Sequence, residues 1–213
     1  MRPWQHAKSS SLSTGRAWTE DLPVHEFLDE TKFACADRRH RVVLHHIDLG
    51  SAVAAKAFPE RDDVDALVRS HVTEDLGRAA SFEEWFDQCD VPRLPTPIHR
   101  RTEDGTEGIA QLVNTRQPSA LHGEVARVCD LLFLPGQFLD HSAERGWPIF
   151  MNSMGPRLAR RIFGPPTSVD QGNIVVDHAA IAEAVIYTAF GRIPDLGEVV
   201  RCFTGEPTRE RQR

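Results

Sequence analysis

The chain has 213 residues, of which 40% are hydrophobic and 26% are charged. This composition is ordinary for a soluble globular protein, and the length suffices for a sizeable core. The formal net charge of −6 argues against a long non-specific contact with nucleic acid, which needs a clear basic surface.

The sequence lacks several familiar signatures. Its four cysteines are scattered without zinc-finger or redox spacing, and its first residues carry no apolar segment typical of a secretion signal. No stretch approaches the length of a membrane span, and the P-loop, GxGxxG and GxSxG fingerprints are missing. We therefore expect a reduced, cytoplasmic setting and no membrane partner.

The first half of the chain reads as a series of helices. The pattern predicts an N-terminal arm over 1–22 and helices over 22–36, 37 to about 58, 62–77 and 81–89. Pro23 is expected near the first turn of the first helix, and the second helix is expected to stop before Pro59. Gly77 is a natural helix stop, and Ser81 with Glu84 forms a capping box.

The second half changes character before helical patterning resumes. Residues 91–118 are rich in proline, glycine and charge, which predicts a linker or long loop. A second helical half is expected over 119–203, followed by a polar tail over 204–213. The expected fold is all-α, with two similar helical halves packed into one globular body.

Two pairs of segments indicate an internal duplication. LGSAVAAKAFPE (49–60) aligns with MGPRLARRIFGPP (154–166), and DLGRAASFEEWF (75–86) aligns with AFGRIPDLGEVV (189–200). Chance similarity between amphipathic helices is the alternative explanation. The polar groups do not repeat, because His45 falls opposite Phe150, His71 opposite Val185 and Asp75 opposite Ala189.

Histidines concentrate in the stretch DRRHRVVLHHIDLG at 37–50. On a helical wheel His40 and His46 lie at the two sides of the apolar face, whereas His45 points largely outward. The adjacent His45 and His46 cannot easily bind one ion from a regular helix. His40 and His46 are therefore the expected inward pair.

Carboxylates accompany the histidines of the two neighbouring helices. His25 and Asp29 are four residues apart and share one helix face, and either Glu74 or Asp75 can lie beside His71. Nitrogen and oxygen ligands on facing helices suit Fe, Mn or Zn. The expected metal ligands are His25, Asp29, His46, His71 and Asp75.

The same groups also permit acid–base chemistry without a metal, because a carboxylate can orient a neighbouring histidine as a general base. His40, Glu74 and Lys32 are the expected catalytic residues, and Arg39 and Arg41 are expected to bind an anionic substrate. The plainer alternative is that each histidine only pairs with its own helical neighbour and stabilises an exposed helix.

Four motifs resemble an uncharacterised family of short bacterial and phage proteins, a domain of unknown function. The motifs are HAKSS (6–10), HEFLDETK (25–32), ADRRHRVVLHH (36–46) and HVTEDLGR (71–78), against a family pattern of HAKSS, HxxxDxxK, ADxRHRxxxHH and HVxEDLGR. The resemblance covers about residues 6–90, and it implies no particular activity. The second half of the chain is a departure from this family. If members of the family associate as dimers, a further hypothesis is that this chain has fused two such units.

The resemblance adds positions to the expected site. The family-like positions are His6, Lys8, His25, Asp29, Lys32, Asp37, Arg39, His40, Arg41, His45, His46, His71, Glu74 and Asp75. His6 and Lys8 are thereby expected to bind substrate, and the sequence leaves open whether HAKSS closes over the site.

The expected function is a small-molecule enzyme with a His/carboxylate centre in the first half, which uses a divalent metal. Hydrolase, oxygenase and lyase chemistry all stay open. A non-catalytic protein that binds a phosphorylated ligand or nucleic acid is the alternative. A third reading makes the polar cluster a stabilising part of an interaction scaffold.

Overall fold

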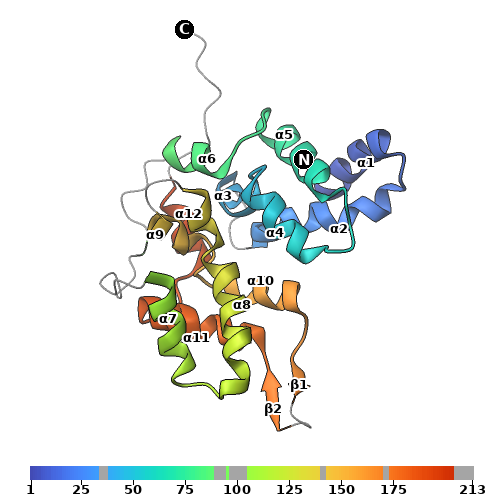
Figure 1. The fold of residues 1–213 in the computed structure, drawn as a ribbon. Coiled ribbons are helices and arrows are strands. Elements are labelled where there is room, and N and C mark those ends of the chain that lie inside the picture. The colour runs from blue at the N-terminus through green and yellow to red at the C-terminus, as the bar shows by residue number, and fades with distance from the viewer. Residues whose placement is uncertain (34–37, 89–94, 96–104, 140–142, 170–172, 204–213) are drawn as a thin grey trace. The chain divides into compact units, whose positions relative to one another are not determined.

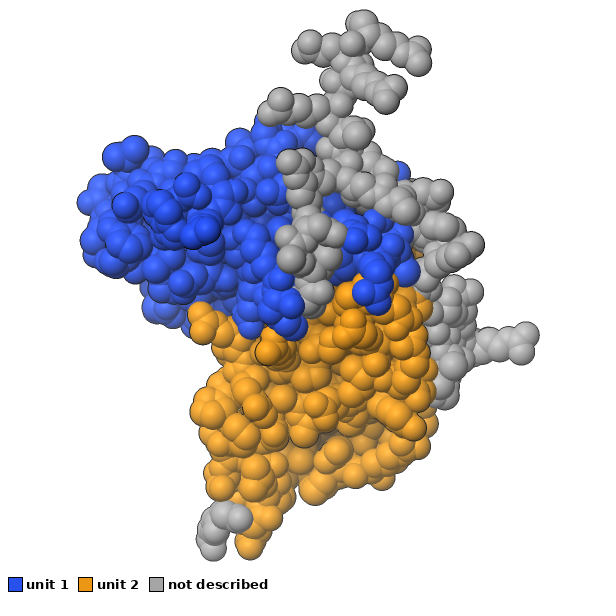
Figure 2. Space-filling view, turned by 180° about the vertical axis from the view of Figure 1, so that it is seen from behind, with its two compact units in different colours: residues 1–92, 200–213 blue, residues 93–199 orange. Residues whose placement is uncertain are grey.

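The computed structural model describes residues 1–33, 38–88, 95, 105–139, 143–169 and 173–203. These residues are mainly helical with one small sheet, which confirms the all-α fold class (Figure 1). The chain divides into two compact units, residues 1–92 with 200–213 and residues 93–199 (Figure 2). The boundary at residue 92 falls inside the segment predicted as a linker.

The first unit is a bundle of short helices. It contains α1 (Pro3–Thr14), α2 (Trp18–Leu28), α3 (Arg41–Leu44), α4 (Leu49–Ala57), α5 (Val64–Leu76) and α6 (Phe82–Gln88), with 3-10 turns at Glu30–Phe33 and Arg38–His40. Helix α5 packs against α1, α2 and α4, and α2 also packs against α1 and α4. Helices α2 and α5 therefore form the centre of this unit.

The N-terminal segment differs from the predicted arm. Residues 1–22 form α1 and the beginning of α2, with Pro3 in the first turn of α1 and Gly15 ending it at a φ of 69°. The buried face of α1 consists of His6, Ala7 and Ser10. Because two of these three residues are polar, the sequence shows no hydrophobic period here.

Helix α2 begins earlier than predicted and ends earlier. It starts at Trp18, so Pro23 lies inside the helix rather than in its first turn, and it stops at Leu28. Residues 34–36 of the predicted helix lie outside the described residues. The early stop places Asp29 at the C-terminal end of α2.

The single helix predicted from residue 37 to 58 is wrong, because the chain breaks between α3 and α4. Asp48 caps α4 through the Leu49 amide (2.7 Å) and also accepts a hydrogen bond from the Phe82 amide (2.9 Å). A Cβ atom at Gly50 would lie 2.4 Å from the Leu44 carbonyl oxygen. The break therefore depends on a glycine at residue 50.

The next two predicted helices are confirmed. Helix α5 ends at Gly77 in the left-handed conformation with a φ of 74°. The Ser81 amide donates to the Glu84 carboxylate (3.0 Å), and the Glu84 amide donates to the Ser81 hydroxyl (3.2 Å), which is the predicted capping box.

The second unit is also helical. It contains α7 (Gly105–Asn114), α8 (His122–Leu132), α9 (Ala143–Gly146), α10 (Gly155–Phe163) and α11 (His178–Phe190), with 3-10 turns at Ser119–Leu121, Leu134–Phe138 and Trp147–Ile149. Helix α12 (Leu196–Arg201) spans the boundary between the units. Helix α11 packs against α7, α8 and α10, and α8 also packs against α7 and α10.

Two features of this unit were not predicted. Helix α7 lies within the segment expected to be a linker, where a single hydrophobic face supports it through buried Ile109 and Val113. Strands β1 (Thr167–Val169) and β2 (Ile174–Val176) form an antiparallel hairpin in the register Thr167↔Val176, Ser168↔Val175 and Val169↔Ile174.

Among the described residues, every helix is too short or too polar to span a membrane.

Candidate metal centre

Four donor atoms converge in the interior of the first unit. They belong to Asp29, His45, His71 and Asp75, and they all lie within 4.8 Å of one another. Asp29 follows the last residue of α2, and His45 follows the last residue of α3. His71 and Asp75 lie one turn apart on α5. Three separate segments thus contribute to one cluster.

The spacing of these atoms matches that of ligands around one ion. His45 Nε2 lies 3.0 Å from His71 Nε2, 3.4 Å from Asp29 Oδ1 and 3.3 Å from Asp75 Oδ2. His71 Nε2 lies 3.8 Å from Asp29 Oδ1 and 3.9 Å from Asp75 Oδ2. Ligands at about 2.1 Å from an ion lie about 3.4 Å apart in a tetrahedron and about 3.0 Å apart at neighbouring octahedral positions.

The donor set also fits a metal chemically. Two imidazole nitrogens with two carboxylate oxygens are typical of Fe, Mn and Zn sites. Asp29 Oδ1 and Asp75 Oδ2 make no hydrogen bond of ordinary geometry within the described part of the chain. Both oxygens therefore retain lone pairs for an ion. These four side chains could hold a divalent metal.

The two carboxylates are buried as anions. The side chains of Asp29 and Asp75 are 3% and 1% exposed. Burial by itself raises the pKa of Asp29, but polar contacts with His40, His45, His71 and Lys32 outweigh it and hold that pKa well below its usual range. For Asp75, burial likewise raises the pKa, and His45, His6 and the Met1 amino group together lower it well below its usual range.

Cations contact both carboxylates of the cluster. Lys32 Nζ lies 2.5 Å from Asp29 Oδ2, the outer oxygen of that side chain, whereas Arg41 Nη2 lies 3.1 Å from Asp75 Oδ2, the oxygen that faces His45. The Lys32 side chain is 34% exposed, so it reaches from the cluster to solvent. His40, predicted to be catalytic, is buried with Nε2 at 3.6 Å from Asp29 Oδ1.

Helix α1 supplies a second layer of contacts beside Asp75. His6 Nδ1 lies 2.6 Å from Glu74 Oε2, and His6 Nε2 lies 3.3 Å from Asp75 Oδ1. His6 is fully buried and contacts two acidic side chains of α5, so the structure gives no support to its predicted substrate-binding role. Glu74 remains 22% exposed.

A further polar chain leads away from His71. His71 Nδ1 lies 3.0 Å from His25 Nδ1, and His25 Nε2 lies 3.1 Å from the Ser10 hydroxyl. Ser10 in turn donates to Asp21 Oδ2 at 3.1 Å. His25 therefore contacts a ligand of the cluster from outside, and the structure does not bring it into the group predicted to bind the ion.

The structure brings His45, and not His46, to the cluster. His45 is fully buried in the cluster rather than pointing outward, because α3 ends at Leu44 and the chain turns. His46 is also fully buried but lies edge-on against Phe82 and Trp85, at centroid distances of 4.9 and 5.9 Å. Burial lowers the pKa of His46 well below 6.5, so its ring is neutral.

The remaining predicted residues lie at the periphery. Lys8 is exposed, with its ammonium group 5.0 Å from the ring centre of Trp4 and 5.6 Å from that of Trp18. That contact with two indole rings gives no support to the predicted substrate-binding role. Arg39 is half-buried next to His40 in the chain.

Ser10 and Asp21 were missed as functional candidates. Ser10 lies one helical turn after His6, and Asp21 lies one turn before His25, so each follows the i,i+4 spacing used to identify the other pairs. Serine is common in loops, and the prediction of an arm over 1–22 removed both residues from consideration.

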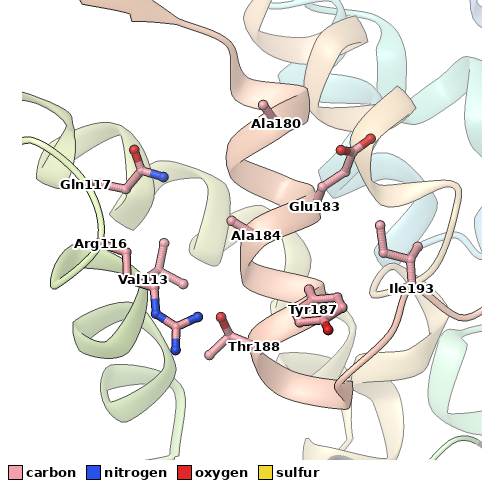
Figure 3. Close-up of a pocket in the computed structure, with 9 residues that line it drawn as sticks. All are labelled: Val113, Arg116, Gln117, Ala180, Glu183, Ala184, Tyr187, Thr188 and Ile193. Carbon is pink, nitrogen blue, oxygen red and sulfur yellow. The ribbon is translucent and has the colours of Figure 1, made fainter.

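A cavity of about 390 Å³ lies elsewhere, in the second unit. Figure 3 shows Glu183, Tyr187 and Thr188 of α11 on one side and Arg116 and Gln117, which follow α7, on the other. None of its lining residues belongs to the cluster of the first unit. We place the candidate chemistry at the cluster, because four donor atoms from buried side chains converge there.

The fold and the cluster define the first unit as a small helical domain with a buried His/Asp centre. Residues 1–94 match the profile of a family described as a domain of unknown function (DUF6915). This match confirms the resemblance to an uncharacterised domain family and covers the whole cluster. No curated protein and no solved structure matches the chain.

Proposed function

We propose that the first unit is a metal-dependent enzyme domain that acts on a small anionic molecule. Asp29, His45, His71 and Asp75 hold one Fe, Mn or Zn ion. The convergence of these four donors from three segments of chain carries the proposal.

The second unit provides an internal comparison, because we propose that it repeats the first. Helices α2 and α8 both have 11 residues, and α5 and α11 both have 13 residues and end at a left-handed glycine. The packing of α8 and α11 on their neighbours follows the same pattern as that of α2 and α5. The inward positions of α2 and α8 coincide when residue 21 is aligned with residue 125.

A hydrogen bond between two loops of the first unit also has an equivalent in the second unit. The Phe82 amide donates to the Asp48 side chain (2.9 Å), and the Leu196 amide donates to the Ser153 side chain (2.9 Å). The two acceptors lie just before α4 and α10, and the two donors lie at the start of α6 and α12. The sequence alignment with shifts of 105 and 114 pairs these same positions.

The proposed repeat shows which residues would stand in place of the cluster in the second unit. Apolar residues occupy the four positions of the second unit that correspond to the cluster, namely Phe133, Phe150, Val185 and Ala189. All four are buried. A helical unit of this kind therefore packs without buried charge, and burying ionised groups costs free energy. The retention of two acids and two imidazoles in the first unit supports a role beyond stability.

Charge supports an anionic substrate. Asp29 and Asp75 would neutralise a divalent ion, which leaves Lys32 and Arg41 as excess positive charge at the same place. The exposed part of Lys32 is the expected contact for a phosphate or carboxylate group. A divalent ion would supply Lewis-acid polarisation of a bound polar group.

Two residues beside the centre have supporting roles, one in proton transfer and one in orienting Asp75. Glu74 is part-exposed and contacts His6 at 2.6 Å, so it can exchange a proton with solvent next to Asp75. His6 fixes Asp75 from its outer oxygen, which leaves Oδ2 directed at His45 and His71.

The test is turnover of a panel of small phosphate esters and carboxylates by the full chain, loaded in turn with Zn, Mn and Fe or treated with a chelator. We expect turnover that requires metal, is lost in His71→Gln and is retained in His46→Phe. Salt-sensitive binding of inorganic phosphate without any turnover would reject the enzyme and favour a binding protein.

A further inference from the structure

The hydrogen bonds that lead from His71 away from the cluster all run in one direction from donor to acceptor. The contacts of the Ser10 hydroxyl determine that direction. The hydroxyl has one hydrogen and lies 3.1 Å from each of three groups, the Ala7 carbonyl, Asp21 Oδ2 and His25 Nε2. The carbonyl and the carboxylate can only accept. The Ser10 hydrogen therefore goes to one of them, and His25 Nε2 must donate to Ser10.

The direction continues through His25 to His71. The Asp21 carboxylate is fully buried and ion-paired with Arg61 Nη2 at 2.8 Å, which keeps it an acceptor. His25 is fully buried, and its ring stacks on the rings of His6 and His71 at centroid distances of 5.7 and 5.2 Å, so burial among other imidazole rings favours its neutral form. A neutral His25 with hydrogen on Nε2 has a lone pair on Nδ1. The 3.0 Å contact between the two Nδ1 atoms then requires the hydrogen on His71 Nδ1.

We propose that Asp21, through Ser10 and His25, is a positioning residue that holds His71 as its Nδ1–H tautomer and directs the Nε2 lone pair into the metal centre. This inference rests on the proposed function for its purpose, but not for its geometry. A ligand histidine in metal sites characteristically donates its other ring N–H to a fixed acceptor, and loss of that acceptor lowers metal affinity 10- to 100-fold.

The second unit supports this assignment. In the alignment of α2 with α8, Val125 stands at the position of Asp21 and Cys129 at the position of His25. The second unit thus lacks the polar groups at these two positions as well as those at the positions of the cluster. If these polar contacts served only to hold α1 on α2, there would be no reason for them to occur only in the unit that carries the cluster.

The chain offers a matched pair of variants. Ser10 and Thr14 both donate to Asp21 Oδ2, at 3.1 and 3.3 Å, but only Ser10 contacts His25. Ser10→Ala removes the link to His25, whereas Thr14→Val removes a hydrogen bond to the same carboxylate oxygen and leaves the link intact. Asp21→Asn keeps the shape of the side chain and adds a donor, and Arg61 retains Asp63 as its partner.

The experiment measures the ¹⁵N chemical shifts of the His71 ring in the full chain by NMR, first without metal, with the signal assigned from its loss in His71→Gln. We expect the Nδ1–H tautomer in the parent and in Thr14→Val, a shift toward the Nε2–H tautomer in Ser10→Ala and Asp21→Asn, and restoration in Ser10→Thr. Zn affinity should fall 10- to 100-fold in the two variants that lose the tautomer.

The outcomes separate the two proposals. An Nε2–H tautomer in the parent, or an unchanged tautomer in both Ser10→Ala and Asp21→Asn, overturns the positioning role. If the tautomer changes as expected but the protein binds no Zn, Mn or Fe, the result would support the positioning role of Asp21 and reject the metal centre. If one of these two variants fails to fold, the other carries the same test.

Discussion

At the residue scale, the adjacent His45 and His46 lie in different surroundings, one in the polar cluster and the other in the hydrophobic core. His45 lies with its Nε2 within 3.4 Å of three other donors, whereas His46 contacts Phe82 and Trp85 and its two ring nitrogens lack a hydrogen-bond partner among the described residues. A buried polar group without a partner costs free energy, so His46 is a poor structural choice in an aromatic pocket.

Opposite effects are therefore expected from substituting these neighbours. His45→Gln should weaken Zn binding at least 100-fold, because it removes a ligand. His46→Phe should leave Zn affinity within about twofold of the parent, because the ring is outside the cluster. Competition with a chromophoric chelator measures both constants, and equal losses in the two variants would contradict the assignment.

The buried neutral histidines also predict how stability depends on pH. Burial holds the pKa of His46 and His71 well below 6.5 and that of His25 at about 4. Between about pH 6.5 and pH 4 the unfolded chain thus binds more protons than the folded chain, so the free energy of unfolding falls as the pH falls. Each such group contributes at most about 2 kcal/mol of this loss at pH 5.

His46→Phe tests this dependence with a single group. Urea unfolding of the metal-free protein at pH 7.5 and pH 5 should show a smaller loss of stability in His46→Phe than in the parent. A pH dependence identical in the two proteins would mean that His46 is not buried as a neutral ring.

At the scale of elements, the break between α3 and α4 decides which histidine enters the cluster. The sequence predicted the helical nature of 37–58 from its apolar period, but not the break, because Gly50 is compatible with a helix and the close approach of the Leu44 carbonyl is a tertiary contact. The wheel consequently placed His46 inward and His45 outward.

Gly50→Ala is expected to disturb this break. The added Cβ would lie 2.4 Å from the Leu44 oxygen, so the backbone must move, at a cost of about 1–3 kcal/mol in stability. Zn affinity should fall with it, because His45 lies next to Leu44. Gly123→Ala is the control, since Gly123 is likewise the second residue of its helix and a Cβ there meets nothing within 4 Å.

For that control, the free energy of unfolding should stay the same or rise by up to about 1 kcal/mol. Thermal unfolding and Zn titration of both variants provide the measurement. An unaffected Gly50→Ala protein would show that the α3–α4 turn does not require glycine.

The success of prediction differed between elements for physical reasons. Helices α5 and α6 carry local signals, a glycine stop and a capping box, and both were predicted. Helix α1 buries His6 and Ser10, so its period is polar and was read as an arm. Asp29, His71 and Asp75 were found from i,i+4 spacing, whereas contacts between helices, such as that of His25 with His71, are invisible to spacing.

At the scale of the whole molecule, the proposed repeat implies that two similar units differ in whether they carry a metal centre. Replacing the cluster of the first unit by the corresponding residues of the second tests this directly. The variant combines Asp29→Phe, His45→Phe, His71→Val and Asp75→Ala with Lys32→Met and Arg41→Met, because these two cations would otherwise lose the carboxylates that they contact.

We expect this variant to fold and to bind no metal, since exchanging both partners of buried ion pairs for apolar residues is often neutral or stabilising by about 1–4 kcal/mol. Circular dichroism and urea unfolding, compared with the metal-free parent, measure the outcome. Failure to fold would show that the cluster is needed for the fold and would weaken the argument that it serves function.

The most direct measurement of the central claim is the metal content of the full chain by elemental mass spectrometry, after purification without a tag and dialysis against Zn, Mn or Fe. We expect close to one ion per chain in the parent and in His46→Phe, and none in His71→Gln. A folded parent that retains no more metal than His71→Gln under all three conditions would contradict that claim.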